Sequence, residues 1–112
     1  MPTFRIYTEG GKLTEKVASI AAKHFPNGFT IFEGRGHWQG GSEPAAVVEI
    51  VQPKSAKHEV EETAREIRQE NNQSAVLVTD TACKDCPGHW FTKSETIEAP
   101  PPKMLEGPKN VG

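Results

Sequence analysis

Residues 29–52 decide the fold, because they hold two apolar runs with a glycine-rich stretch between them. The first run is FTIFE (Phe29–Glu33), the glycine-rich stretch is GRGHWQGGSE (Gly34–Glu43), and the second run is AAVVEIVQ (Ala45–Gln52). Short apolar runs bounded by glycine and proline are typical of strands. We therefore predict two strands, joined by a glycine-rich loop. A long twisted hairpin, with Trp38 packed against the sheet edge, is the plain structural alternative.

Periodicity extends this prediction in both directions along the chain. Residues 3–8 alternate as a strand does, and residues 12–24 carry apolar side chains at helical spacing. After Pro53, the Ser55 hydroxyl is suited to cap a second helix that runs to about Glu70. Residues 74–79 (SAVLVT) then form a fourth predicted strand.

The order βαββαβ indicates an α+β fold, the ferredoxin-like sandwich with a four-stranded antiparallel sheet and both helices on one face. The other face of such a sheet is normally polar. Here its predicted positions carry Phe32, Val47, Val51 and Leu77. Because a monomer rarely exposes so many apolar side chains together, we expect the open face to be buried in an oligomer.

Composition predicts a domain followed by a C-terminal arm, and it argues against some classes of function. Residues 1–82 form the predicted ferredoxin-like domain, whereas 83–112 read as a Cys- and Pro-containing C-terminal arm, extended or partly disordered, with Trp90 and Phe91 able to fold back. A net charge of −2 without a basic patch argues against a protein that binds nucleic acid. The sequence shows neither a membrane-spanning run nor a signal-peptide pattern, which favours a cytoplasmic protein.

Two groups of side chains could carry chemistry. Trp38 and Glu43 together suit a small cation, because an indole face and a carboxylate both attract positive charge. Their plain alternative is a packing tryptophan beside an exposed glutamate. Cys83, Cys86 and His89 are a weak candidate for zinc, since no second pair of ligands follows at matching spacing.

The motifs also resemble two groups of small proteins. Phe25–Thr30 (FPNGFT), Gly36-x-Trp38-x-Gly40, Glu43 and Gln73–Val78 (QSAVLV) are similar to a set of uncharacterised bacterial and phage proteins. Gly36-His37-Trp38, Glu43 and Asn72–Val78 resemble the phage-encoded S-adenosylmethionine (SAM) lyases, formerly called SAM hydrolases. That family has a tyrosine where this chain has Trp38, and a longer segment before the glutamate.

The resemblance to SAM lyases implies a ferredoxin-like homotrimer with active sites between subunits. It implies that Glu43 fixes the α-amino group of SAM and that Trp38, His37 and Tyr7 contribute to substrate binding. No metal or cofactor is expected. The leading hypothesis is therefore a lyase that cleaves SAM to 5′-methylthioadenosine and homoserine lactone, in the host cytoplasm if it is phage-encoded.

Two other hypotheses stay open at this point. One is a non-catalytic ferredoxin-like oligomer that binds a small ligand or a host protein. The other is a protein whose Cys/His tail binds zinc and carries the function.

Overall fold

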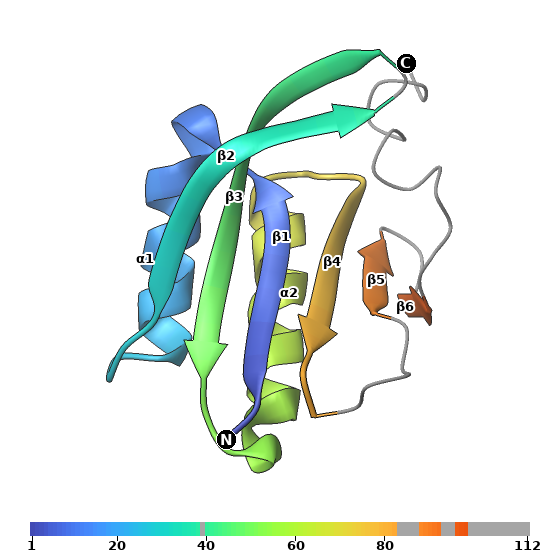
Figure 1. The fold of residues 1–112 in the computed structure, drawn as a ribbon. Coiled ribbons are helices and arrows are strands. Elements are labelled where there is room, and N and C mark those ends of the chain that lie inside the picture. The colour runs from blue at the N-terminus through green and yellow to red at the C-terminus, as the bar shows by residue number, and fades with distance from the viewer. Residues whose placement is uncertain (39, 83–87, 93–95, 99–112) are drawn as a thin grey trace.

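The computed structural model describes residues 1–38, 40–82, 88–92 and 96–98 of the 112-residue chain. Its elements are β1 (Thr3–Glu9), α1 (Thr14–His24), β2 (Thr30–Trp38), β3 (Gly41–Val51), α2 (Lys57–Glu70), β4 (Ala75–Asp80), β5 (His89–Thr92) and β6 (Thr96–Glu98). Short 3₁₀ turns, Gly11–Leu13 and Lys54–Ala56, precede the two helices. Both helices lie on the same side of the sheet (Figure 1).

The sheet confirms the ferredoxin-like arrangement and enlarges it. Its strand order is β2-β3-β1-β4-β5-β6, and every neighbouring pair is antiparallel. The first four strands in this order are those of the βαββαβ pattern. The predicted four-stranded sheet was therefore too small, because β5 and β6 add two strands next to β4.

Residues after 82 thus contribute to the sheet. Val76 of β4 lies opposite Phe91 of β5, and Leu77 lies opposite Trp90. Trp90 and Phe91 are 4% and 2% exposed, which confirms that they fold back onto the domain. The division of the chain at residue 82 stays a prediction.

The core lies between the sheet and the two helices. Alternate residues of the central strands point to this side, among them Ile6 of β1 and Val48 of β3, and both are fully buried. They pack with the apolar faces of the helices, whose buried residues are Val17, Ile20 and Ala21 of α1 and Val60, Ala64 and Ile67 of α2. The spacing of these residues in the sequence therefore identified the buried faces correctly.

Two local predictions were wrong. Ser55 does not cap α2: it lies inside the preceding 3₁₀ turn, and the residue at the helix start, Ala56, makes no side-chain capping bond. The glycine-rich stretch is not a loop, because β2 and β3 continue through it as paired strands from Gly34–Ala45 to Trp38–Gly41. The alternative of a long hairpin was correct for the backbone. The chain reverses near Gly40, whose φ of +78° favours glycine.

The β2–β3 hairpin extends past the end of β1 and curves over the upper end of the sheet (Figure 1). Residues of both hairpin strands line a cavity at that end of the sheet, together with the end of β1.

Candidate functional site

A cavity of about 310 Å³ lies where β1 ends and the hairpin continues. It is lined by Tyr7–Glu9 of β1, residues 32–37 of β2, residues 43–47 of β3, Gln73 and Ala75. We call this cavity the hollow. β1, the β2–β3 hairpin and the start of β4 contribute to it, and these segments are distant in sequence, so it exists only because the sheet assembles in this order.

Three of the four residues predicted to bind or react belong to the lining of the hollow: Tyr7, His37 and Glu43. Tyr7 and Glu43 project to the open face, whereas His37 pairs with Ser42 and alternates with Gly36, so its side chain projects to the other face of the hairpin. The fourth, Trp38, belongs to β2, but its side chain lies outside the part of the structure that is described. Glu43 stands opposite Gly36 in the β2–β3 register, and Tyr7 stands opposite Val47 in the β1–β3 register. The structure brings these residues to one place, and their individual roles stay predictions.

Glycines in β2 leave room beside Glu43. Residues directly opposite each other in an antiparallel pair project to the same face. Gly36 faces Glu43 and Gly34 faces Ala45, so β2 contributes no side chain at either position. A Cβ atom added at Gly34 would meet nothing within 4 Å. The glycines thus keep the hollow open, a purpose that the sequence pattern alone did not reveal.

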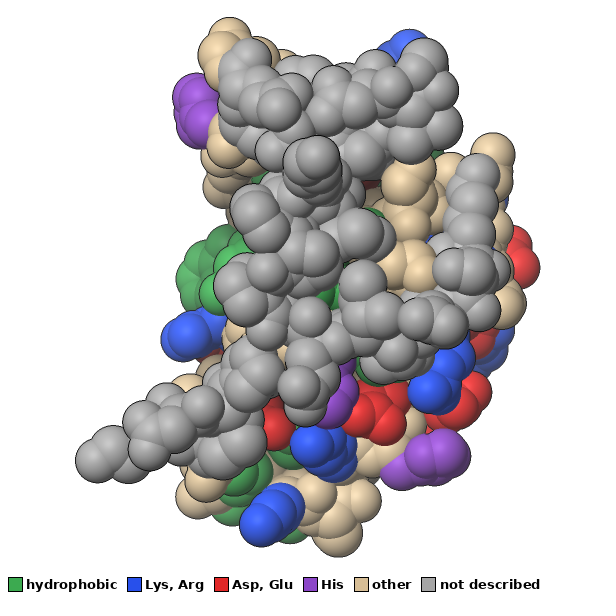
Figure 2. Space-filling model, turned by 90° about the vertical axis from the view of Figure 1, so that its right-hand side faces the viewer, with side chains coloured by type: hydrophobic (Ala, Val, Ile, Leu, Met, Phe, Trp, Pro, Cys, Tyr) green, Lys and Arg blue, Asp and Glu red, His purple; other side chains and the backbone are tan. Residues whose placement is uncertain are grey.

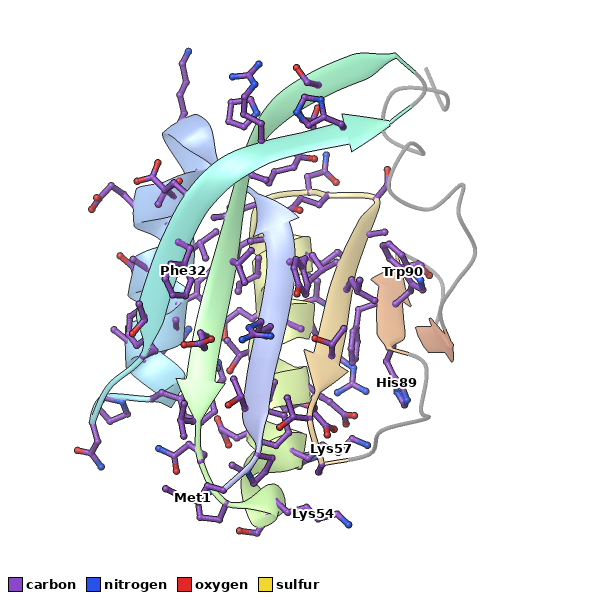
Figure 3. The ribbon with its side chains drawn as sticks, viewed as in Figure 1. Met1, Phe32, Lys54, Lys57, His89 and Trp90 are labelled. Carbon is purple, nitrogen blue, oxygen red and sulfur yellow. The ribbon has the colours of Figure 1, made fainter. Side chains whose placement is uncertain are left out.

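One side of the hollow is apolar. Val47 and Tyr7 are partly exposed on the open face, and Phe32 is 51% exposed. Phe32 lies on β2 at one side of the sheet, well away from Trp90 at the other (Figure 3). These groups offer a surface to the uncharged part of a ligand.

The hollow contains a second carboxylate that the sequence interpretation missed. Glu9 is the last residue of β1 and pairs with Ala45 of β3. The sequence interpretation ended this strand at residue 8, so Glu9 fell outside it. The alternation Arg5, Tyr7, Glu9 was the available signal, because it places all three side chains on the open face.

Glu9 and Glu43 make the hollow acidic. Burial raises the pKa of the Glu9 carboxyl, and the negative charge of Glu43 raises it further. Neither carboxylate has an ion-pair partner among the described residues, since the nearby arginines are engaged elsewhere. Arg5 pairs with Glu49 at 3.0 Å, and Arg35 donates to the Ser42 hydroxyl, also at 3.0 Å. A cation entering the hollow would therefore meet uncompensated negative charge.

The backbone that carries Glu9 is held on both sides. Its N–H donates to Oε1 of Gln73 at 3.2 Å, and Nε2 of Gln73 donates to the Thr8 hydroxyl at 2.6 Å. Gln73 is 2% exposed, so its amide is fixed within the structure. On the other side, Gly10 donates its N–H to the Pro44 carbonyl at 3.1 Å. These bonds fix the end of β1 relative to β3.

Of the three candidate zinc ligands, only His89 lies among the described residues. Cys83 and Cys86 lie outside the described residues, while His89 begins β5 near the far edge of the sheet (Figure 3). Among the described residues, no group of three or more His, Cys, Asp or Glu side chains could hold a metal ion.

None of the helices in the described part of the chain is long and apolar enough to cross a membrane.

The fold is that of a ferredoxin-like α+β protein, and known structures share it. No model of a protein family matches the sequence, and no curated protein matches it either. A phage SAM lyase in complex with S-methyl-5′-thioadenosine aligns over 88% of this chain and 89% of its own, with a TM-score of 0.59 and 14% identity. The apo state of a phage SAM lyase aligns over the same shares, with a TM-score of 0.55 and 15% identity.

A second class of proteins shares the fold as well. CPII, a nitrogen regulatory PII-like protein from Thiomonas intermedia K12 bound to ADP, AMP and bicarbonate, aligns over 88% of this chain and 93% of its own. Its TM-score is 0.50 and its identity 16%. The resemblance to SAM lyases is therefore confirmed for the fold, and at these identities it extends no further.

Proposed function

We propose that the protein is a SAM lyase that cleaves SAM to 5′-methylthioadenosine and homoserine lactone. The observation that carries this proposal is the hollow, in which two carboxylates without cationic partners among the described residues face an apolar wall. SAM combines two positively charged groups, a sulfonium and an ammonium, with a carboxylate and an uncharged nucleoside whose adenine ring can pack on apolar side chains. The SAM lyase-like fold supports the same proposal.

The charge of the hollow distinguishes this proposal from a PII-like, non-catalytic function. The PII-like neighbour is bound to ADP, AMP and bicarbonate, all of them anions. Two glutamates at the hollow would repel such ligands and would attract a cation. The fold alone does not separate the two functions, whereas the residues at the hollow favour the cation.

The proposed roles of the side chains come from the resemblance to SAM lyases. Glu43 binds the α-ammonium group of SAM and so fixes the amino-acid end of the substrate. Tyr7 lines the hollow on the same face as Glu43 and encloses the remainder, together with His37 and Trp38 as the resemblance implies. The volume of about 310 Å³ is at the lower end of the range for small-molecule sites, so a second subunit would complete the enclosure.

The reaction needs positioning more than chemical groups. The carboxylate of SAM attacks its own γ-carbon, forming the carbon–oxygen bond of the lactone. The carbon–sulfur bond breaks, and its electron pair stays on sulfur, which becomes the neutral thioether of 5′-methylthioadenosine. No proton is transferred and no water is consumed. Holding the chain in this near-attack geometry supplies the catalysis.

We further propose a homotrimer that assembles through the open face. Phe32 and Val51 are each 51% exposed there, and Tyr7, Val47 and Leu77 are partly exposed. Apolar side chains appear at the left of Figure 2, the side that corresponds to the open face in Figure 1. The hollow opens on the same face, so assembly would bring a second subunit to it.

The test is to incubate purified protein with SAM and to separate the products by chromatography. The wild type forms 5′-methylthioadenosine. Glu43→Gln lowers the rate at least about 100-fold, because the substrate loses the group that orients it. Glu15→Gln removes an exposed carboxylate in the first turn of α1 and keeps full activity. Unchanged SAM at high enzyme concentration, or a fully active Glu43→Gln, contradicts the proposal.

A further inference from the structure

Glu9 lies beside Glu43 on the open face. Because Glu9 pairs with Ala45, it is the diagonal neighbour of Glu43, two residues along β3. The Cα atoms of such neighbours are about 7–8 Å apart, within reach of two glutamate side chains. Both residues line the hollow, and the negative charge of Glu43 adds to the rise in the pKa of Glu9.

The position of Glu9 is unfavourable for the ionised form of its carboxyl group. Its carboxylate is partly removed from water and faces a like charge, and both effects disfavour the ionised form. The other titratable or charged residues of the lining are Tyr7, Glu33, Arg35 and His37. Only Tyr7 shares the face of Glu9 and Glu43, because the other three alternate with the open-face positions of β2 and project to its other face. Even so, Gln73 and Gly10 fix the backbone on either side of Glu9. An unfavourable charge in a fixed position is a common feature of ligand-binding sites.

We propose that Glu9 contacts the sulfonium of SAM and makes the hollow select sulfonium over neutral thioether ligands. This inference rests on the proposed function, in which Glu43 takes the ammonium group. SAM has two cationic groups, and the hollow has two carboxylates that lack partners among the described residues. Glu9 lies next to Tyr7 along its face of β1, towards the apolar wall where the nucleoside would bind.

The position of the charge predicts how Glu9 acts. The sulfonium loses its charge as the carbon–sulfur bond breaks, so a carboxylate next to it stabilises the substrate more than the transition state. Glu9 therefore contributes to binding and not to the chemical step. The same loss of charge lowers the affinity for the neutral product, 5′-methylthioadenosine. Glu9→Gln is expected to raise KM about tenfold without lowering kcat.

Two inert ligands separate this role from turnover. Sinefungin carries an ammonium group at the place of the sulfonium, whereas S-adenosylhomocysteine is a neutral thioether. Titration calorimetry of the wild type should show sinefungin binding at least about tenfold more tightly. Glu9→Gln should lower the affinity for sinefungin and leave that for S-adenosylhomocysteine unchanged, so that the two affinities become similar. Glu9→Asp and the control Glu15→Gln should both keep the preference, which excludes misfolding as the cause.

Each failure has its own signature. A preference for sinefungin that survives in Glu9→Gln overturns the role of Glu9, even if SAM is cleaved. Failure of both ligands to bind the wild type overturns it too. If the preference depends on Glu9 while SAM stays intact, the cation-selective role stands and the lyase proposal falls.

Discussion

Gly10 is the residue on which the geometry of the hollow depends most closely. A Cβ atom added there would lie 2.6 Å from the carbonyl carbon of Ala45 and 2.7 Å from its oxygen. Because both are backbone atoms of the central strand β3, they cannot move aside cheaply. The close approach of β1 and β3 at this point sets the distance between Glu9 and Glu43.

Gly10→Ala should therefore destabilise the protein by about 2–3 kcal/mol and weaken binding of sinefungin. Gly34→Ala is the matched control for stability, because its Cβ atom would enter open space. Urea denaturation of both variants measures the difference. Equal stability of Gly10→Ala and the wild type would show that β1 and β3 can separate without cost.

At this scale the resemblance to SAM lyases named Glu43, His37 and Tyr7 as site residues. All three belong to the lining of the hollow, and their roles stay predictions. The sequence interpretation missed Glu9, because the glycines after it look like the end of a strand. Gly10 instead belongs to a close backbone contact across the sheet, and such a contact depends on a partner more than thirty residues away. Local patterns do not contain that information.

At the scale of elements, α1 and α2 are joined by a charged clasp at the end of α1. His24 lies between two carboxylates of α2, with Nε2 2.8 Å from Glu66 and Nδ1 in contact with Glu59. Burial opposes the charged ring, but the hydrogen bonds and charges of both glutamates outweigh it and raise the pKa of His24. Hydrogen bonds from Lys23 and His24 lower the pKa of Glu66.

The clasp predicts a pH-dependent stability. A raised pKa means that the contribution of His24 is complete below its ordinary value of 6.5 and is lost as the pH rises through the folded value. A lowered pKa means that the contribution of Glu66 is complete above 4.5 and is lost as the pH falls through its folded value. Stabilisation by the clasp is therefore greatest between pH 4.5 and 6.5.

His24→Gln should cost about 1 kcal/mol within this window and less at higher pH. Urea midpoints of the wild type and the variant, measured across the pH range, test the prediction. His58→Gln serves as the control, because His58 is largely exposed and its Nε2 is as far as 3.9 Å from Glu62, too far for a hydrogen bond. A cost of His24→Gln that does not vary with pH would contradict the assigned charges.

The hairpin shows why element boundaries were harder to predict than elements. A run of glycines and polar residues normally ends a strand. The first strand was therefore predicted to end near residue 33 and the second to begin near residue 45. In the structure they pair with each other from Gly34–Ala45 to Trp38–Gly41. The pairing satisfies their backbone groups, and the missing side chains provide the space of the hollow.

At the scale of the whole molecule, one face of the sheet stays uncovered by helices. The alternation in β3 predicted this face correctly, since Ala46, Val48 and Ile50 are buried and Val51 is exposed. The two added strands were not predicted, because His89–Thr92 is short and follows a Cys- and Pro-containing segment. Its place beside β4 is a long-range pairing that no local pattern specifies.

Assembly through this face gives a further prediction. The wild type should sediment as a trimer, and Val51→Lys should shift it towards the monomer by placing a charge in the contact. Lyase activity at low protein concentration should fall in parallel, since the hollow would lose its second wall. Ala22→Lys, exposed on α1 of the helical layer, should leave the trimer intact. A wild type that is monomeric at high concentration contradicts this assembly.

The most direct test of the whole account is the fate of SAM with the enzyme in molar excess. We expect 5′-methylthioadenosine and homoserine lactone to appear in equal amounts, with no methyl group transferred and no cofactor added. Rapid quenching in acid preserves the lactone for quantification. SAM recovered intact, or methylthioadenosine formed without an equal amount of lactone or the homoserine derived from it, would contradict the central claim that this hollow is a SAM lyase site.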